Sequence, residues 1–256
     1  MKVLVVGGSG LVGSFITPYL REHHDLRVLD VRAPEHDVEW IEGSATDPAV
    51  LRTALDGVDA FVNLMMRSPQ GSLSKDQTLK EIVENYETNT LALHLLLFTA
   101  QELGVTRGVH TSTMSVHLGG RDWYPAEELV PYDTPSVYGM TKALGEQICE
   151  YFARWFGMNL VGLRITGPRT REQYLAERRD PPHYPGIRRL YVTDEEDMAR
   201  AFLAALEAVQ VGRARWDAFF ISGDEREETH NLSKARRVLG WTPQSQLLLS
   251  EEERAR

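Results

Sequence analysis

The sequence predicts an α/β fold, a doubly wound parallel sheet with helices on both faces, followed by a small irregular C-terminal lobe. Strand-like and helix-like segments alternate through the first 165 residues, which is typical of a parallel sheet. A glycine-rich segment follows the first of these strands. Beyond Ile165 the alternation gives way to a polar stretch that prolines interrupt, which predicts loops in that region.

The elements follow from apolar runs and their periodicity. Short apolar runs predict buried strands at Lys2–Val6, Leu26–Leu29, Ala60–Leu64, Gly108–Ser112 and Leu160–Ile165. Helical spacing predicts helices at Leu11–His23, Pro48–Leu55, Glu81–Leu103 and Ser136–Phe156. After the irregular stretch, the patterns predict a helix at Glu195–Val209, a strand at Ala218–Ser222 and a short helix at Leu232–Leu239. In such a sheet, ligands bind beyond the carboxyl ends of the strands.

Composition narrows the class of protein. The chain has 256 residues, enough to bury a full core, and a net charge of −9, which argues against nucleic acid as a partner. No apolar run approaches the roughly 20 residues that cross a membrane, and no cleavable leader is evident. The only cysteine, Cys149, excludes an internal disulfide, and the histidines lack metal-ligand spacing. We therefore expect a cytoplasmic protein with no metal, membrane or nucleic-acid partner.

The segment after the first strand predicts a dinucleotide site. Gly7, Gly10 and Gly13 follow a G-x-x-G-x-x-G spacing, with Leu11 and Val12 opening the predicted helix. Glycines in this place allow a tight turn, a close approach of backbone to phosphate and close helix–strand packing. The pyrophosphate would then lie at the helix N-terminus. The other interpretation of the spacing is an ordinary strand–turn–helix.

An acidic residue at the end of the second predicted strand favours NAD as the cofactor. A carboxylate at Asp30 accepts hydrogen bonds from the ribose hydroxyls of the adenosine and repels a 2′-phosphate. Arg32 lies two residues further on and can tolerate such a phosphate. NAD is therefore expected, and NADP is the less favoured alternative.

Tyr138 and Lys142 lie four residues apart in a predicted helix and therefore share one face. A free tyrosine has a pKa near 10, and an ammonium one turn away is expected to lower the Tyr138 pKa. The phenolate can then take a proton from a substrate hydroxyl while hydride leaves the same carbon. The hydroxyls of Thr111–Thr113, at the end of a predicted strand, are candidates to hold the reacting oxygen. Without these surroundings, such a pair would be an ordinary surface feature.

Together these motifs resemble the extended short-chain dehydrogenases/reductases of the NAD-dependent epimerase/dehydratase family, over nearly the whole chain. Further residues that match the family pattern are Asn89, Leu163-Arg164, Gly167-Pro168, Asp197–Arg200 and Ser233–Pro243. The resemblance implies a Rossmann domain, with Lys142 also binding the nicotinamide ribose. It implies Thr113, with its neighbour Ser112, as the hydroxyl partner of Tyr138.

The same resemblance implies further cofactor contacts. In the family pattern, an acid that contacts adenine usually follows the third strand. In this chain Ser44 and Ala45 occupy that place. Leu64, Met65 and Met66 occupy the floor below the nicotinamide, where small residues are usual, and Asn89 lies in the fourth helix of the family pattern.

In size and layout the chain is most similar to the short uronate dehydrogenases, which oxidise a sugar acid to a lactone with NAD. Between Arg169 and Arg189 there are six arginines and three acidic residues, a net +3 that suggests an anionic ligand. We take Arg164, Arg169 and Arg171 as candidate substrate residues; a solvated basic loop is the alternative. Met114 and Ser115 stand where those enzymes carry two substrate-contacting residues.

The expected domains are an NAD-binding Rossmann domain, 1–165 plus about 190–222, and a substrate-capping lobe, about 166–189 and 223–256. The expected activity is hydride transfer between NAD and a hydroxyl or hemiacetal carbon of a small, sugar-like and acidic substrate. The alternatives are an NAD-dependent sugar or nucleotide-sugar epimerase and a non-catalytic NAD(P)-sensing protein. The broad apolar face of Glu81–Leu103 predicts either a homodimer or a thick core.

Overall fold

The structure is a computed structural model that describes residues 1–67, 77–179, 191–212 and 215–245. Within these ranges a seven-stranded sheet has the order β3-β2-β1-β4-β5-β6-β9. Its strands are β1 (Lys2–Val6), β2 (Asp25–Asp30), β3 (Glu39–Glu42), β4 (Ala60–Asn63), β5 (Arg107–Thr113), β6 (Asn159–Ile165) and β9 (Arg215–Ile221). All neighbouring strands in this sheet pair in parallel.

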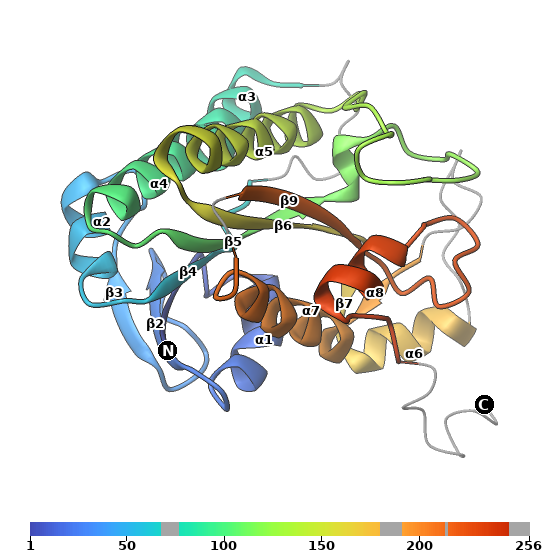
Figure 1. The fold of residues 1–256 in the computed structure, drawn as a ribbon, viewed down its shortest axis with the longest axis horizontal. Coiled ribbons are helices and arrows are strands. Elements are labelled where there is room, and N and C mark those ends of the chain that lie inside the picture. Colours follow the sequence, from blue (N-terminus) through green and yellow to red (C-terminus); the bar gives the residue numbers. More distant parts are fainter. Residues whose placement is uncertain (68–76, 180–190, 213–214, 246–256) are drawn as a thin grey trace.

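Helices cover both faces of the sheet (Figure 1). One face carries α1 (Leu11–Leu20), α7 (Glu195–Ala208) and α8 (Ser233–Leu239), and the other carries α2 (Pro48–Leu55), α4 (Ala92–Glu102) and α5 (Val137–Phe156). The other α-helices of the described residues are α3 (Leu79–Tyr86) and α6 (Arg171–Arg179). Two short strands, β7 (Pro168–Arg169) and β8 (Thr193–Asp194), pair with each other in a separate sheet. This arrangement confirms the predicted doubly wound α/β fold.

The first strand shows why the sheet must be covered on both sides. Val3 and Val5 belong to the core cluster beneath α1 and α7, whereas Leu4 and Val6 belong to the cluster beneath α2, α4 and α5. Successive side chains of a strand point to opposite faces, so a continuous apolar run needs a layer on each face. Cys149 lies in the second of these clusters as a buried core residue.

The sheet reverses its winding at β1, which lies between β2 and β4. The chain first builds outward from β1 through β2 to β3, and then crosses back to place β4 on the other side. Crevices for ligands form at such a reversal, beyond the carboxyl ends of the two strands. The segments after β1 and β4 are therefore the first place to look for a site.

The predicted helix Glu81–Leu103 is interrupted in the structure. It consists of α3, a π-helical segment at Glu87–Leu91, and α4. Thr78 caps α3, since its side chain accepts a hydrogen bond from Glu81 while the Glu81 carboxylate accepts from the backbone of Thr78. Short π segments inside helices are frequent at functional sites, and this one contains Asn89.

The edge strand β3 lacks the apolar run of the inner strands. Glu39 and Glu42 flank an exposed Trp40, and only Ile41 packs against a core cluster. Charged side chains are common on edge strands because they discourage pairing with another chain. Within the described ranges, no helix combines the length and apolarity that a membrane crossing requires. The proposed division into two domains stays a prediction.

Candidate active site

The turn between β1 and α1 has the geometry of a phosphate site. Gly7 has a positive φ of 80°, and its amide donates to the carbonyl of Leu29 at 2.8 Å. A Cβ at Gly13 would lie 2.1 Å from the carbonyl oxygen of Gly8, so only glycine permits this helix–strand contact. Gly10 is the N-cap of α1, and no side chain caps this helix. The backbone amides that open α1, at Leu11 and Val12, therefore remain suited to an anion.

Asp30 is fixed beside this turn. One carboxylate oxygen accepts the amide of Ser9 at 3.0 Å, and the other accepts the amide of Arg32 at 3.1 Å. The guanidinium of Arg32 donates to the carbonyl of Ser9 at 3.2 Å. A carboxylate has about four acceptor positions, so Asp30 keeps capacity for ribose hydroxyls after these two bonds. Next to β3, Ala45 is buried, and the Ser44 hydroxyl bonds with that of Thr46 at 2.8 Å.

The segment after β4 forms a floor against the glycine turn. Leu64 donates its amide to the carbonyl of Val6 at 2.8 Å, and Asn63 accepts the amide of Met65 at 3.0 Å. A Cβ at Gly7 would lie 3.0 Å from the nitrogen of Met65. Leu64 and Met65 are buried, whereas Met66 is 54% exposed. The two strand ends are thus in direct contact at the winding reversal.

Asn89 ties this floor to helix α5. Its side-chain oxygen accepts the amide of Arg67, and its side-chain nitrogen donates to the Arg67 carbonyl, both at 3.0 Å. The same nitrogen lies 3.0 Å from the hydroxyl of Thr141. Asn89 is buried, so these contacts define a positioning role for it.

The candidate catalytic side chains meet at the same end of the sheet. The Tyr138 hydroxyl lies 3.3 Å from the sulfur of Met66, and Lys142 donates from Nζ to the carbonyl of Met65 at 3.4 Å. Thr113, the last residue of β5, forms a hydrogen bond with Tyr138 that lowers the phenol pKa. The structure therefore brings together Tyr138, Lys142, Thr113 and the predicted floor.

The electrostatics of this group differ from the prediction. Burial raises the pKa of Tyr138 to about 12, and the hydrogen bond with Thr113 opposes this only in part. Burial also lowers the pKa of Lys142 to about 8. The expectation that Lys142 brings down the Tyr138 pKa is therefore wrong for the protein alone. The loss of hydration penalises the phenolate and the ammonium at once.

Ser112 faces a different partner from its neighbour Thr113. Its buried hydroxyl donates to a carboxylate oxygen of Glu146 at 2.5 Å. Glu146 follows Lys142 by one turn of α5, on the side of the helix that packs against β5. Thr113 is thus the hydroxyl that accompanies Tyr138, and Ser112 belongs to the network around Glu146.

Arg164 is at the centre of that network. Its guanidinium binds both oxygens of Glu146, with the shortest distance 2.7 Å, and it also donates to the Tyr132 hydroxyl at 3.0 Å. Its remaining N–H groups meet the carbonyl of Glu127 at 3.0 Å and the ring nitrogen of His117 at 3.3 Å. All five donors are occupied and the side chain is only 3% exposed. Arg164 is therefore not among the substrate contacts that we propose.

The other two candidate substrate arginines also have acidic partners. Arg169 pairs with Glu177, and Arg171 lies 3.3 Å from the fully buried carboxylate of Asp194. The further arginines of the predicted basic segment have side chains outside the described residues. The described part of this segment thus carries matched charges.

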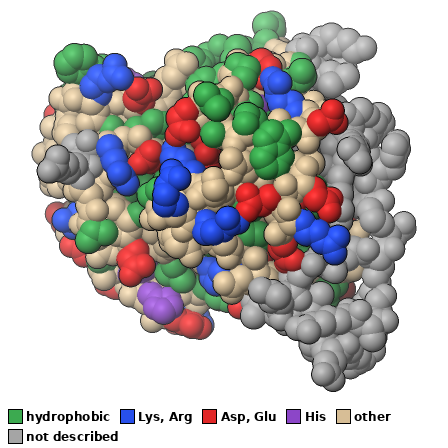
Figure 2. Space-filling model, turned by 45° about the vertical axis from the view of Figure 1, so that its right-hand side comes forward, with side chains coloured by type: hydrophobic (Ala, Val, Ile, Leu, Met, Phe, Trp, Pro, Cys, Tyr) green, Lys and Arg blue, Asp and Glu red, His purple; other side chains and the backbone are tan. Residues whose placement is uncertain are grey.

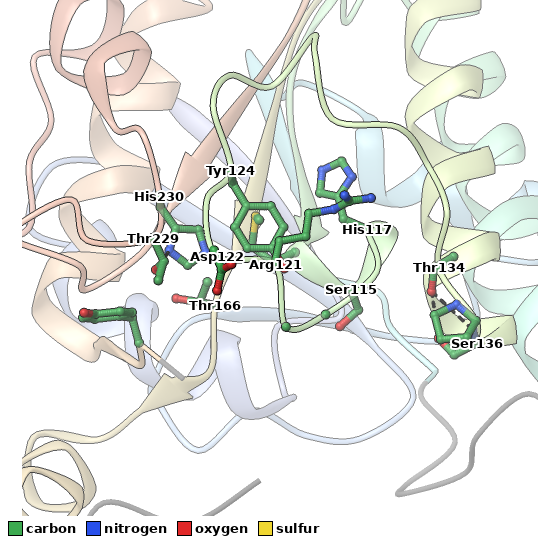
Figure 3. Close-up of a pocket in the computed structure, with 15 residues that line it drawn as sticks. Ser115, His117, Arg121, Asp122, Tyr124, Thr134, Ser136, Thr166, Thr229 and His230 are labelled. Carbon is green, nitrogen blue, oxygen red and sulfur yellow. Dashed lines mark hydrogen bonds between the residues drawn. The ribbon is translucent and has the colours of Figure 1, made fainter. Parts of the chain in front are cut away.

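A cavity of about 260 Å³ is lined by residues that lie close in sequence to Thr113 and Tyr138 (Figure 3). Met114 and Ser115, which follow Thr113, line one side, and Ser136, which caps α5 two residues before Tyr138, lines another. The remaining lining residues come chiefly from 117–124 and from Thr229 and His230. Sequence reasoning missed these two segments, because irregular loops carry no periodic signal.

The model of the NAD dependent epimerase/dehydratase family matches residues 3–178 of the chain. The chain belongs to this family. This membership confirms the predicted resemblance to a family whose description names NAD. It does not by itself distinguish the reactions within the family.

Two relatives illustrate the range of the family. A 3 beta-hydroxysteroid dehydrogenase/isomerase of Mycobacterium tuberculosis is 32% identical over 155 residues, which cover 57% of this chain and 41% of the relative. The chain thus spans less than half the length of that relative. An NAD-dependent glucose-6-phosphate dehydrogenase of Haloferax volcanii is 25% identical over 267 residues, which cover 94% of this chain and 92% of the relative.

Solved structures share the fold over almost the whole chain. A short-chain dehydrogenase/reductase superfamily protein from Agrobacterium tumefaciens, solved with bound NAD, has a TM-score of 0.79 and 22% identity, and the match covers 100% of this chain and 97% of that one. A mutated uronate dehydrogenase has a TM-score of 0.73 and 21% identity, with 96% of this chain and 83% of that one covered. At these identities the likeness establishes the fold.

Breaking the buried pair between Arg164 and Glu146 should destabilise the protein strongly. Arg164→Met leaves a buried carboxylate without its cation, which we expect to cost about 3–5 kcal/mol in the free energy of unfolding. Arg154→Met is the matched control, because it removes an arginine from an exposed pair with Glu150 of the same helix and should cost about 1 kcal/mol or less. Urea unfolding at pH 7 measures both. Equal losses in the two variants would contradict the role given to Arg164.

The phenol of Tyr138 should stay protonated in the NAD-free protein at moderately alkaline pH. With a pKa of about 12, about 1% of it is ionised at pH 10, and this fraction rises about tenfold per pH unit. The difference in phenolate absorbance between wild type and Tyr138→Phe should therefore be flat from about pH 8 to 10. In denaturant the same difference should titrate near the ordinary pKa of about 10, which is the control. A folded-state signal below pH 10 would show that burial does not dominate.

Proposed function

We propose that the protein is an NAD-dependent oxidoreductase that transfers hydride between nicotinamide and a hydroxyl or hemiacetal carbon of a small sugar-like substrate. The observation that carries this proposal is the convergence of Tyr138 and Lys142 on the floor formed by Met65 and Met66, with Thr113 beside Tyr138. This floor contacts the glycine turn at the winding reversal of the sheet. A hydride acceptor held by that turn would thus reach the phenol.

The residues fit the cofactor of the family. The uncapped N-terminus of α1 suits the pyrophosphate, and Asp30 suits the adenosine ribose. Lys142 is the residue that we assign to the nicotinamide ribose, since its Nζ lies at the floor beside Met65. When bound, NAD supplies the hydride acceptor and, in its oxidised form, a positive charge on the nicotinamide ring.

That positive charge would lower the pKa of Tyr138, which burial raises. Two cations, the nicotinamide ring and Lys142, would then favour the phenolate against the cost of burial. Tyr138 accepts the proton of the substrate hydroxyl, and Thr113 holds the same oxygen by a hydrogen bond. In the reverse direction Tyr138 donates the proton to a carbonyl oxygen.

The alternative activity within the family is epimerisation. An epimerase uses the same three side chains and returns the hydride to the opposite face of the substrate, so it consumes no NAD. A protein that senses NAD(P) without turnover would bind the cofactor and show no dependence on Tyr138. Net reduction of NAD separates these possibilities.

We also propose that the protein is a cytoplasmic homodimer. Apolar side chains remain exposed along α3, the π segment, α4 and α5, among them Leu79, Leu91, Phe98 and Trp155. Figure 2 shows apolar side chains at the surface at the top of the molecule, the end that α3 and α5 occupy in Figure 1. An apolar surface of this kind is typical of a contact with another copy of the chain.

Replacing the phenol should abolish turnover and leave the cofactor in place. We expect Tyr138→Phe to lower kcat by about 10²–10⁴-fold, because the proton acceptor is lost, while the affinity for NAD changes little. The assay follows nicotinamide absorbance with NAD and a panel of uronic acids, neutral aldoses and polyols. Tyr151→Phe on the same helix is the control and should retain full activity. An unchanged rate in Tyr138→Phe would refute the proposed role, and substrate interconversion without net NADH would indicate an epimerase.

A charge on the apolar face should separate the protomers. Trp155 is 69% exposed, and Trp155→Glu would place a carboxylate where we expect a dry contact. Light scattering after gel filtration should then give twice the chain mass for the wild type and the chain mass for the variant. Val211→Glu adds the same charge at an apolar residue that is 83% exposed, beyond α7 on the opposite face of the sheet, and should stay dimeric. A monomeric wild type would contradict the proposal.

A further inference from the structure

The cavity of about 260 Å³ is the feature that the predicted substrate residues do not explain. None of the three candidate arginines lines it. We propose that this cavity is the substrate site of the enzyme and that it takes an uncharged, polyhydroxylated molecule of the size of one sugar ring, in preference to a sugar acid. This inference rests on the proposed function, because it names the substrate class for the same catalytic group.

The position of the cavity suits a substrate. It begins at Met114 and Ser115, directly after Thr113, and it reaches Ser136 at the start of the helix that carries Tyr138. Figure 3 shows Thr229 and His230 approaching it from the C-terminal part of the chain, facing the loop that carries Arg121 and Tyr124. A molecule in the cavity would therefore lie beside the reacting hydroxyls.

The size of the cavity argues against a nucleotide sugar. Pockets for drug-sized ligands usually measure about 300–1,000 Å³, and this cavity is below that range. The loops that enclose it are held together, since Tyr124 donates its amide to the carbonyl of Thr229 at 2.7 Å and accepts from Asn231 at 3.0 Å. The site thus suits one ring rather than a ring with a diphosphate and a nucleoside.

Among the described residues that line the cavity, Arg121 is the one lysine or arginine, and it has a carboxylate partner. Its guanidinium pairs with Asp133. A second carboxylate, Asp122, also lines the cavity. Burial lowers the pKa of His117 to about 4, so this ring is uncharged at pH 7.

His230 also brings no unmatched charge to the cavity. Its ring nitrogen Nδ1 lies 2.8 Å from the Thr229 hydroxyl and 3.5 Å from the carboxylate of Asp224. The Asp224 carboxylate accepts the amides of Thr229 and His230. Burial raises its pKa, but the His230 side chain and the amides of Glu228, Thr229 and His230 outweigh burial and hold the Asp224 pKa below its usual range. Asp224 is thus negatively charged at neutral pH, so the charge beside the His230 ring is that of a carboxylate. A substrate carboxylate would meet no cation without a counter-charge among these groups; the Nε of Arg121 is a donor without a partner within the described residues, and its guanidinium is already paired with Asp133.

The polar groups of the lining suit hydroxyl groups. Ser115 makes no side-chain hydrogen bond within the described residues and is exposed at the cavity. Thr229 and His230 present a hydroxyl and a ring, and the ring of His230 stacks on that of Tyr124 with centroids 5.0 Å apart. Hydroxyl and imidazole groups both donate and accept, as sugar hydroxyls do. Such a lining can satisfy a neutral polyol without leaving a buried charge unpaired.

The test measures binding, so that it does not depend on turnover. The Tyr138→Phe variant, with and without saturating NAD, is titrated with glucose and galactose and with the matched acids glucuronate and galacturonate. Calorimetry and saturation-transfer NMR provide the readouts. We expect at least one neutral sugar to bind at least about tenfold more tightly than its acid, because the acid brings an unpaired carboxylate near Asp122.

A filled cavity provides the second variant. Ser115→Trp in the same background should weaken sugar binding by at least about tenfold, since the indole occupies the cavity, while NAD affinity changes by less than about twofold. Glu207→Trp, at an exposed residue of α7 outside the cavity, should leave both unchanged.

Tighter binding of the acids, equal sugar binding in Ser115→Trp, or no binding of any neutral sugar would overturn the inference. Suppose that neutral sugars bind, that Ser115→Trp abolishes this binding, and that the wild type reduces no NAD. The loss of binding would then support the cavity assignment, and the absence of NAD reduction would contradict the proposed oxidoreductase activity.

Discussion

Glu146 lies one helical turn after Lys142 and accepts hydrogen bonds from Ser112, Tyr132 and Arg164. These partners come from β5, from the loop before α5, and from β6. One carboxylate therefore holds the catalytic helix against two central strands. A buried carboxylate is stable only when its charge is matched and its oxygens are hydrogen-bonded, and Arg164 supplies that match. The placement of Lys142 and Thr113 depends on this contact.

The same burial that fixes the side chains also shapes their chemistry. Lys142 is buried and Tyr138 is partly buried, and the loss of hydration makes the phenol hold its proton and the ammonium release its proton more readily. The protein alone thus presents Tyr138 as an acid rather than as a base. Under the proposed mechanism, the positive charge that comes with oxidised NAD makes the phenolate accessible. Proton transfer would then be confined to molecules that have the cofactor in place.

The arginines illustrate how tertiary contacts change the meaning of a charge pattern. In the sequence, the segment from Arg169 to Arg189 is basic and suggests an anionic substrate. In the fold, Arg164 and Arg171 lie against carboxylates from outside that segment, Glu146 and Asp194, and Arg169 pairs with Glu177 of the segment itself. A cation that is matched inside the protein exerts little attraction on a ligand. The cavity that we propose as the substrate site has Arg121 as the one lysine or arginine among its described lining residues, and this arginine is paired with Asp133.

The sequence by itself missed the edge strand β3, which has no apolar run, and predicted loops where α6 forms. It determined the other six strands of the sheet, the glycine turn and the pairing of Tyr138 with Lys142. These features depend on local rules: apolar runs form buried strands, Gly13 is required by a close backbone approach, and residues four apart share a helix face. It could not show that Ser112 would turn to Glu146 while Thr113 met Tyr138, nor that Asn89 would lie in a π segment. It also gave no sign of the cavity between Arg121 and His230. Those outcomes rest on contacts between segments far apart in the chain. Burial in such contacts shifts the pKa values of Tyr138 and Lys142, and carboxylates that are distant in the sequence pair with Arg164 and Arg171. Only the tertiary structure brings such groups together.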